Sequence, residues 1–278
     1  PEVSTQFIGD IIKIPLSYND DGDTNIPVAS LDNRVVYTFD ASAIDGRYPT
    51  DKLFLASNGK LYGMTKYGPN GYFTPPSGQP FAVLFEYDLE TNRYRVVHSF
   101  APLSMLNNIF YKGSNQIAGL IEPTPGLLVG MTQGRQVFKY SIATETTTII
   151  HTFPQFVDGN NQYSPGFATG FTKASDGNLY AIIERIKVAN VFKRSALVKC
   201  NYITNTCSLI NIDNYFDCRQ GGTLVEGLPG KLYFSSYQGG VYNSGCTTGC
   251  GSLMEYDYNT NTLTSKYNYN IETVGFNA

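Results

Sequence analysis

Two glutamates, Glu122 and Glu226, come nearest in this sequence to a catalytic arrangement. Each stands four residues before a turn glycine, at matching positions of a repeated pattern, and Lys173 and Leu55 hold the same position in two other copies. A pair of carboxylates at the right separation can hydrolyse a glycosidic bond. Nothing in the spacing sets that separation, and the lysine between the glutamates favours a ring of ion pairs around a channel instead.

The chain has two histidines, His98 and His151, and they occupy equivalent positions in consecutive copies of the pattern. A zinc site needs three or four converging ligands, and no third ligand accompanies this pair. We therefore expect both histidines to be structural. The sequence also contains no phosphate-binding loop, dinucleotide fingerprint, nucleophile elbow or Cys/His dyad.

The five cysteines lie in hairpins and Gly/Asn-rich loops, which indicates an oxidising compartment. Cys200 and Cys207 flank a short turn, so we expect a disulfide that joins two adjacent strands. Cys218, Cys246 and Cys250 are predicted to share one face of the fold. Cys246 can pair with Cys250, or Cys218 can pair with either of them, and one thiol is left over.

An acidic run near the start of the chain contains Asp20, Asp21, Asp23 and Asn25. Alternating oxygen ligands in a loop with glycine can bind calcium. This run lacks the bidentate glutamate of a complete calcium loop, so a solvated acidic turn is the favoured interpretation. We expect no other metal and no cofactor.

A repeated pattern with a period of about 55 residues must position these side chains. Each copy contains a Gly-x-Leu-Tyr turn and strand, then a Phe-x-Tyr strand, and then a strand that ends like Val-His-Ser-Phe. Clear examples are residues 58–63, 84–87, 97–100, 150–153, 176–180, 230–233 and 253–256. Alternating apolar and polar residues predict half-buried strands, and Asn, Asp and Gly mark the turns.

Four short strands per period are typical of a propeller blade. We predict a single all-β domain over residues 1–278, a β-propeller of five blades with four antiparallel strands each. Full repeats are expected at about 40–96, 97–149, 150–209 and 210–269. The fifth blade would combine residues 7–39 with 270–278 and close the ring. Closure within one chain is favoured, and the alternative is that the C-terminal tail completes a neighbouring subunit.

The pattern resembles the GloVer-type tandem repeats of exported bacterial proteins, whose units read like DGNLYG-T, GG, VFK and LHSF. Residues 176–180, 236–240, 137–139 and 97–100 carry the resemblance, which covers about residues 35–269. The second copy departs from it, because its Gly-rich loop shrinks to residues 133–135. The resemblance implies a propeller-like module exposed at a surface, and it implies no catalytic residues.

In such a meander the turns after the first and third strands lie on one face, and the connections after the second and fourth strands lie on the other. The turns of the first kind are short here, so we expect all the long connections to share one face. Long loops on a rigid scaffold usually carry binding residues. These connections contain a set of aromatic side chains that suits protein contact or sugar stacking, although the rings can also pack the loops together. The set is Tyr67, Tyr72, Phe73, Phe110, Tyr111, Phe156, Tyr163, Tyr215, Phe216, Tyr237 and Tyr242.

Composition narrows the function further. Charge is sparse and balanced, with 20 basic and 23 acidic residues, so we expect no nucleic-acid partner, and no apolar run is long enough to span a membrane. The chain begins at Pro1, and we expect a mature or excised form. We predict a non-enzymatic, extracellular or surface-exposed structural or adhesive protein that contacts other proteins or its own copies. A carbohydrate-binding propeller is the alternative, and a glycoside hydrolase is less favoured.

Overall fold

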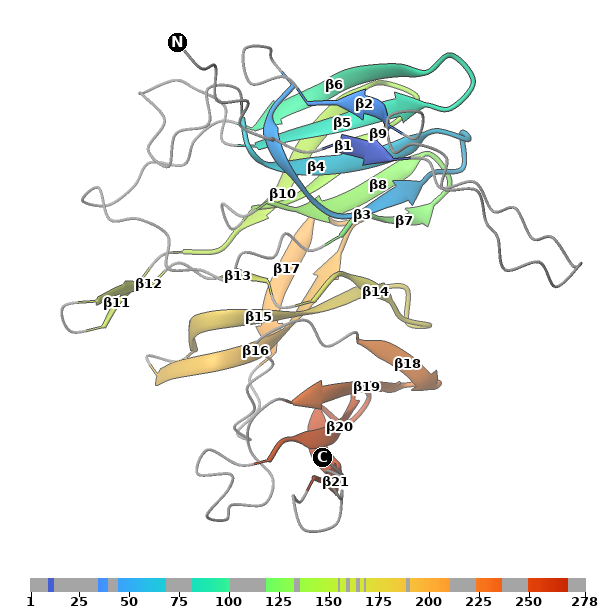
Figure 1. The fold of residues 1–278 in the computed structure, drawn as a ribbon. Helices are drawn as coiled ribbons and strands as arrows, with labels where there is room; N and C mark the ends of the chain where they lie inside the picture. Colours follow the sequence, from blue (N-terminus) through green and yellow to red (C-terminus); the bar gives the residue numbers. More distant parts are fainter. Residues whose placement is uncertain are drawn as a thin grey trace, which may run out of the picture. The chain divides into compact units, whose positions relative to one another are not determined.

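The computed structural model of the chain is built from strands joined by turns and connections (Figure 1). The chain divides into two compact units. The first unit contains Pro1–Thr50 and Gly59–Pro102, and the second contains Asp51–Asn58 and Leu103–Ala278. The described residues are 10–12, 35–39, 45–68, 82–100, 119–132, 136–154, 156–158, 161–163, 166–167, 169–188, 191–210, 224–236 and 250–269. Within them no helical segment has the length and hydropathy needed to cross a bilayer.

Four antiparallel sheets follow one another along the chain. The first contains β3 (Arg47–Leu55), β4 (Leu61–Tyr67), β5 (Ala82–Asp88) and β6 (Arg93–Phe100). The second contains β7 (Ile121–Thr124), β8 (Leu127–Met131), β9 (Gln136–Ser141) and β10 (Thr146–Thr152). The fourth contains β18 (Val225–Leu228), β19 (Lys231–Ser236), β20 (Ser252–Asp257) and β21 (Thr262–Asn268).

The third sheet has the same order, but its first strand is split in two. Both β13 (Gly166–Phe167) and β14 (Thr172–Lys173) pair with β15 (Leu179–Val188), which is followed by β16 (Val191–Asn201) and β17 (Thr206–Ile210). Two small hairpin-like sheets complete the list, β1 (Asp10–Ile12) with β2 (Val35–Thr38) and β11 (Phe156–Asp158) with β12 (Asn161–Tyr163). The prediction of an all-β fold made of four-stranded antiparallel meanders is confirmed.

The turn between the first and second strand of each sheet uses a glycine in the left-handed region. Gly59, Gly126, Gly177 and Gly230 have φ between 78° and 87°. Side chains with a Cβ rarely adopt this conformation, so the repeated glycine in the sequence marks a backbone requirement. Glu122 and Glu226 stand four residues before two of these glycines, Gly126 and Gly230.

The turn between the third and fourth strands of each sheet places a residue other than glycine in the left-handed region. Its last residue is left-handed in all four sheets, with φ between 51° and 57°. Three of these residues are asparagines, which tolerate this conformation better than most residues, and the second sheet has Glu145 there. At the start of the turn, the Asp257 side chain accepts hydrogen bonds from the Asn259 and Thr260 amides at 2.9 and 3.3 Å. Asp and Asn therefore close these hairpins locally, before any contact with another sheet.

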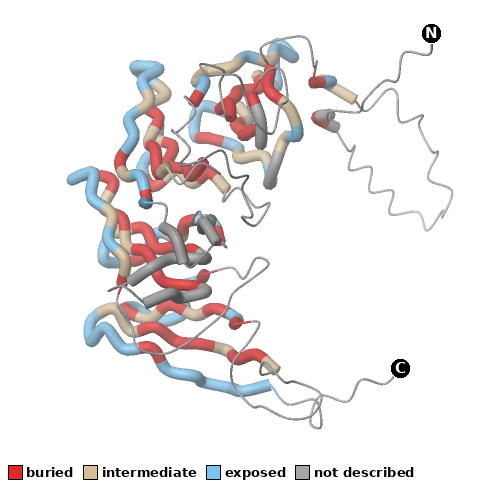
Figure 2. The backbone as a smooth tube through the Cα atoms, turned by 90° about the vertical axis from the view of Figure 1, so that its left-hand side faces the viewer, coloured by how far each residue is buried: buried red, intermediate tan, exposed pale blue. Residues whose placement is uncertain are grey.

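One face of the third sheet packs against the second sheet. Ala181 and Val198 belong to a buried cluster with Val129 and Met131 of the second sheet. In Figure 2 buried stretches of the backbone alternate with exposed ones, and many of the sharp bends are exposed. Each aliphatic side chain of this kind contributes roughly 1.5–3 kcal/mol when fully buried, so the contact between sheets supplies much of the stability.

The opposite face of the third sheet packs against the fourth sheet. Ile182 and Leu197 lie in a second buried cluster together with Phe234 and Met254. Because side chains alternate along a strand, neighbouring residues of β15 and β16 enter different clusters. The third sheet is thus covered on both faces, as a four-stranded meander inside a stack must be.

In the other unit, β2 packs on the first sheet. The Tyr37 ring stacks on Tyr94 with centroids 4.1 Å apart, and Phe39 meets Phe85 edge to face at 5.3 Å. The Tyr87 hydroxyl donates to the Val36 carbonyl at 3.4 Å. Of residues 7–39, which are predicted to contribute to a fifth blade, the structure describes 10–12 and 35–39.

Gly130 of β8 offers a test of the packing in the second sheet. A Cβ at this position would lie 2.7 Å from both Leu120 and Phe138, so we expect G130A to lower the free energy of unfolding by about 1–3 kcal/mol. Gly170 is the matched control, because its nearest neighbour would be 3.6 Å away. Denaturant unfolding followed by circular dichroism measures both variants, and equal stabilities would contradict this packing.

Candidate functional site

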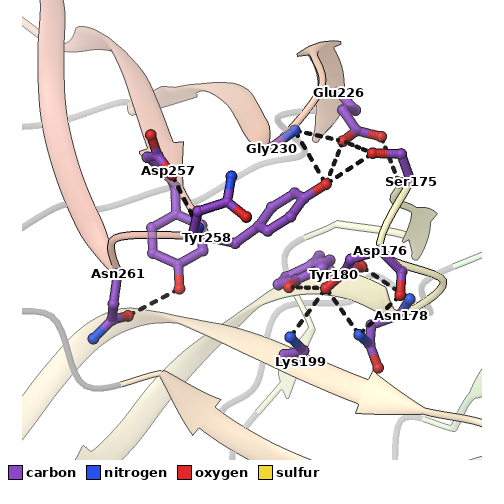
Figure 3. A network of polar contacts seen from close by, with 12 residues as sticks. Ser175, Asp176, Asn178, Tyr180, Lys199, Glu226, Gly230, Asp257, Tyr258 and Asn261 are labelled. Atoms are coloured by element: carbon purple, nitrogen blue, oxygen red, sulfur yellow. Dashed lines mark hydrogen bonds and ion pairs between the residues drawn. The ribbon is translucent and has the colours of Figure 1, made fainter.

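Glu226 lies on β18, the first strand of the fourth sheet, and its carboxylate contacts a turn of the third sheet. It accepts hydrogen bonds from the Ser175 amide at 2.7 Å and the Ser175 hydroxyl at 2.8 Å. The Tyr258 hydroxyl donates at 2.7 Å and the Gly230 amide at 3.1 Å. Figure 3 shows these groups converging on the two carboxylate oxygens. The carboxylate therefore fastens two neighbouring sheets together.

Glu122 on β7 makes the equivalent contact. Its carboxylate accepts from the Ser57 amide at 2.8 Å, from the Ser57 hydroxyl at 2.6 Å and from the Gly126 amide at 2.7 Å. We call each of these arrangements a glutamate clasp: Glu122 with Ser57 is the first, and Glu226 with Ser175 is the second. In each, the glutamate also binds the amide of its own turn glycine, so one side chain orders two turns.

Tyr258 strengthens the second clasp from the fourth sheet. Its hydroxyl lies 2.9 Å from the Ser175 hydroxyl and accepts a hydrogen bond from the Gly230 amide at 3.1 Å. Its ring stacks on Tyr180 of the third sheet, with centroids 5.5 Å apart and planes 19° from parallel. Apolar stacking and hydrogen bonding by one side chain thus act on the same contact between sheets.

A second polar cluster, centred on Asp176, lies beside the clasp. The Tyr180 hydroxyl donates to this carboxylate at 2.9 Å, and the Lys199 ammonium pairs with it at 3.0 Å. The Asn178 side chain donates at 2.8 Å, and the Lys199 ammonium lies 5.5 Å from the centre of the Tyr180 ring. The ring that stacks on Tyr258 is therefore itself held by a charged partner (Figure 3).

The electrostatics of the clasp favour an ionised carboxylate. Burial raises the pKa of Glu226, but hydrogen bonds from Tyr258, Ser175 and the Gly230 amide outweigh burial and hold this pKa below its ordinary value. The same balance lowers the pKa of Asp176. A general acid of a glycosidase needs a raised pKa, so Glu226 is suited to accept hydrogen bonds and unsuited to donate a proton.

The expected ring of ion pairs is replaced by a different arrangement. Lys173 donates to the Pro123 carbonyl at 2.8 Å, and among the described residues it is not paired with Glu122 or Glu226. Leu55, at the matching position of the first sheet, is exposed. The two glutamates therefore bind equivalent serines and Lys173 binds a backbone carbonyl, whereas Leu55 is exposed.

Serine partners and Tyr258 are the residues that sequence reasoning missed. The signal was present as an alternation: the turns of the first and third sheets read Ala-Ser-Asn-Gly and Ala-Ser-Asp-Gly, whereas those of the second and fourth carry glutamate and Pro-Gly. A serine in one copy and a glutamate in the next indicate a contact between consecutive units. The contact between the second and third sheets uses Lys173 and Lys139 instead, each donating to a backbone carbonyl.

The structure confirms the disulfide between Cys200 and Cys207, which are directly opposite each other on β16 and β17. Cys250 is also disulfide-bonded. Cys218 and Cys246, the two candidates for its partner, lie outside the described residues, so the choice between them stays open.

Both histidines pack against the phenylalanine two residues further along their strand. His98 meets Phe100 at 4.6 Å between ring centroids, and His151 meets Phe153 at 4.5 Å, each close to edge to face. Burial lowers the pKa of both imidazoles. The same contact in two sheets is what a structural role at repeat-equivalent positions predicts.

Most of the aromatic residues predicted to form a binding face lie outside the described part of the chain. Tyr67 ends β4, and Phe156 and Tyr163 are opposite partners in the β11–β12 pair. The acidic run with Asp20, Asp21, Asp23 and Asn25 also lies outside the described residues. Within the described residues, no group of three or more His, Cys, Asp or Glu side chains is placed to hold a metal ion.

Comparisons with known proteins give distant structural similarities. No protein-family model matches the chain, and no curated protein sequence matches it significantly. An oligogalacturonate lyase in complex with manganese is similar over 85% of this chain and 57% of its own length, with 11% identity and a TM-score of 0.49. TolB from Acinetobacter baumannii is similar over 84% and 46%, with 10% identity and a TM-score of 0.43.

A third solved structure, the GH74 enzyme of Niastella koreensis, is similar over 79% of this chain and 30% of its own length, with 15% identity and a TM-score of 0.45. This chain therefore spans less than two thirds of the length of each of these three proteins. Their functions differ from one another, so no activity is assigned from them.

Replacing the carboxylate of the second clasp tests its structural role. We expect E226Q to lower the free energy of unfolding by about 1 kcal/mol near neutral pH, a modest value because water competes for this exposed contact. Folding lowers the pKa of the Glu226 carboxylate, so its contribution to stability is present above the ordinary pKa of a glutamate. That contribution is lost as the pH falls through the pKa that the carboxylate has in the folded chain. The difference in stability between the two proteins should therefore shrink as the pH falls below the ordinary pKa of a glutamate, about 4.3.

Glu90 supplies the matched control for this experiment, because its side chain is exposed on a turn of the first sheet. We expect E90Q to be as stable as the unchanged chain near neutral pH. Denaturant unfolding at several pH values measures all three proteins. An E226Q variant as stable as the control near neutral pH would contradict the clasp.

The histidines predict a separate pH dependence. Because folding lowers both pKa values, the unfolded chain binds more protons below the ordinary pKa of about 6.5, and stability should fall as the pH is lowered from about 7 to 5. The H98Q/H151Q double variant should show a smaller slope over this range. Unfolding free energies measured across it give the slopes, and identical slopes would show that the imidazoles are not perturbed.

Proposed function

We propose that this chain is a structural or adhesive protein without enzymatic activity, located outside the cell or at the surface of a cell or particle. In this proposal it assembles with other proteins or with its own copies, as a component of a filament, surface layer or particle. Its fold is a propeller of five sheets, in which residues 7–39 and 270–278 build the fifth sheet and close the ring.

The glutamate clasps carry this proposal. The side chains that come nearest to a catalytic pair, Glu122 and Glu226, have their oxygens engaged by backbone amides and hydroxyl groups of neighbouring turns. A carboxylate in such surroundings stabilises a scaffold and is poorly suited to attack or protonate a substrate. This supports a structural role and makes the glycoside hydrolase the least favoured reading.

The pairing of β1 with β2 supports the proposal of a fifth sheet. They pair antiparallel, with Asp10 opposite Thr38 and Ile11 opposite Tyr37, and β2 packs on the first sheet through Tyr37 and Phe39. A two-stranded pair is only marginally stable alone, and the other sheets have four strands. Residues from both ends of the chain would supply the missing strands.

The arrangement of connections supports a role in contact with other molecules. In each antiparallel sheet the second and third strands join at the end opposite the short glycine turn. The longest stretches between described strands follow either the second or the fourth strand of a sheet, and they are residues 69–81, 101–118, 211–223 and 237–249. They contain most of the aromatic residues named above, which suit contact with a protein surface. Disulfides are compatible with an extracellular location.

A carbohydrate-binding propeller remains the second candidate. The opposite placement of Phe156 and Tyr163 in the β11–β12 pair favours it, since two aromatic residues at one register position can form a stacking platform for a sugar.

Sedimentation of the purified chain over a range of concentrations, with and without reductant, tests the assembly proposal. We expect the average mass to rise with concentration, because association by contact between copies follows mass action. A strict monomer that also captures no partner protein would contradict it. Glycan-array binding that is lost in F156A or Y163A would favour the carbohydrate-binding alternative, and turnover of a glycoside abolished by E226Q would favour the hydrolase.

A further inference from the structure

The hairpin of β15 and β16 is longer than the other strands of the third sheet. On one side, β17 pairs with β16 only over residues 197–201, and on the other side β13 pairs with β15 only as far as Glu184. Beyond these positions the two strands pair only with each other among the described strands, up to Val188 opposite Val191. We call residues 185–188 and 191–194 the ribbon.

The ribbon is the most basic part of the chain. It contains four of the 20 basic residues, Arg185, Lys187, Lys193 and Arg194, and no acidic residue. Elsewhere in the sequence, no separate stretch of ten residues has more than two basic residues. The concentration is hard to see in the sequence, because five uncharged residues, 188–192, separate two short basic clusters. The hairpin brings these clusters side by side.

Strand pairing distributes the basic residues unequally between the two faces of the ribbon. The register of β15 and β16 is unbroken along their whole length, and Lys187 is opposite Phe192. Strand alternation therefore places Arg185, Lys187 and Arg194 on one face, together with Phe192. Lys193 lies on the other face. We call the face with three basic residues the basic face.

The basic face has an arrangement that disfavours folding of the ribbon by itself. The register sets Arg185 opposite Arg194, and like charges at opposite positions of a sheet are destabilising. The ribbon supplies no acidic residue to balance them. In the fourth sheet, by contrast, Lys231 pairs with Glu255 at 3.0 Å. A local conflict of this kind is expected where residues serve a function instead of stability.

We propose that the basic face of the ribbon binds a linear polysaccharide whose sugar units carry carboxylate or sulfate groups. Opposite residues of a sheet are about 5 Å apart, so one such group can bridge Arg185 and Arg194, and guanidinium groups bind oxyanions by paired hydrogen bonds. Lys187 lies two residues, about 7 Å, further along the strand, at a distance that suits a second acidic group. Phe192, opposite Lys187, adds an aromatic residue of the kind that stacks on sugar rings.

The charge of the whole chain favours a polysaccharide over a nucleic acid. Even with the ribbon included, the net charge is −3. Double-stranded DNA carries one charge per about 1.7 Å of its axis, so the rest of an acidic protein repels it unless a broad basic surface is present. A polysaccharide with one acidic group per sugar needs fewer basic partners. The inference goes beyond the proposed assembly, because this site needs neither a second copy nor a closed ring.

Affinity electrophoresis of the full chain in gels that contain alginate, dextran sulfate or neutral dextran tests this proposal. Alginate supplies carboxylates and dextran sulfate supplies sulfates, so the polymer that binds more tightly identifies the preferred group. Neutral dextran should not retard the chain. We expect R185Q and R194Q each to weaken binding to the preferred polymer by roughly fivefold or more, since each loses charge-assisted hydrogen bonds.

K193Q is the matched control, because it removes one charge from the same ribbon but from the other face. It should bind within about twofold of the unchanged chain, as expected for the loss of a charge that makes no direct contact. Circular dichroism and melting curves establish that the variants fold, and R194Q should melt no lower than the unchanged chain because it removes a contact between like charges.

Chemical acetylation of lysines completes the test. Lys187 should react in the free chain and react more slowly when the polysaccharide is bound, while the rate at Lys193 stays the same. A Lys187 that does not react in the folded free chain would overturn the inference, since the chain itself would then cover the basic face.

Two binding results would also contradict the inference. One is that K193Q weakens binding as much as R194Q does, and the other is that duplex DNA binds more tightly than either charged polysaccharide at equal charge concentration. Sedimentation should show the same self-association for R185Q, R194Q and the unchanged chain. A failure of polysaccharide binding is therefore distinguishable from a failure of the assembly proposal.

Discussion

Burial of one sheet by the next is the constraint on which the rest of this structure depends. The backbone groups of a four-stranded meander form hydrogen bonds within the sheet, but both faces of an isolated meander would be exposed to water. The third sheet resolves this by placing Ala181 and Val198 in one core and Ile182 and Leu197 in another. Strand alternation and sheet stacking are thus linked, because β15 and β16 place buried apolar side chains on both faces of the sheet.

Polar groups then fix how neighbouring sheets meet. The glutamate clasps act at the turns, where apolar burial is smallest, and they use backbone amides that the turn geometry already exposes. Tyr258 joins the two effects, since its ring stacks on Tyr180 while its hydroxyl enters the clasp. Each carboxylate accepts several hydrogen bonds at a contact that stays partly exposed to water, so it contributes modestly to stability and mainly fixes how the two turns meet.

Sequence alone predicted the features that are set locally. Turn glycines and the Cys200–Cys207 disulfide follow from spacing, because left-handed backbone and a short hairpin restrict the residues that fit. Contacts between sheets were harder, since they depend on how one meander is rotated against another. Glu226 was singled out as a candidate acid, and only the structure brings Ser175 and Tyr258 to it. The aromatic connections and the acidic run lie outside the described residues and remain predictions.

The account therefore makes burial of one sheet by the next the main source of stability. Native-state hydrogen exchange, measured strand by strand, tests this most directly. Amides of β15 and β16, in the sheet that packs against a neighbour on both faces, should exchange only when the whole chain unfolds. Amides of these two strands that exchange as fast as those of the exposed turns would contradict the account.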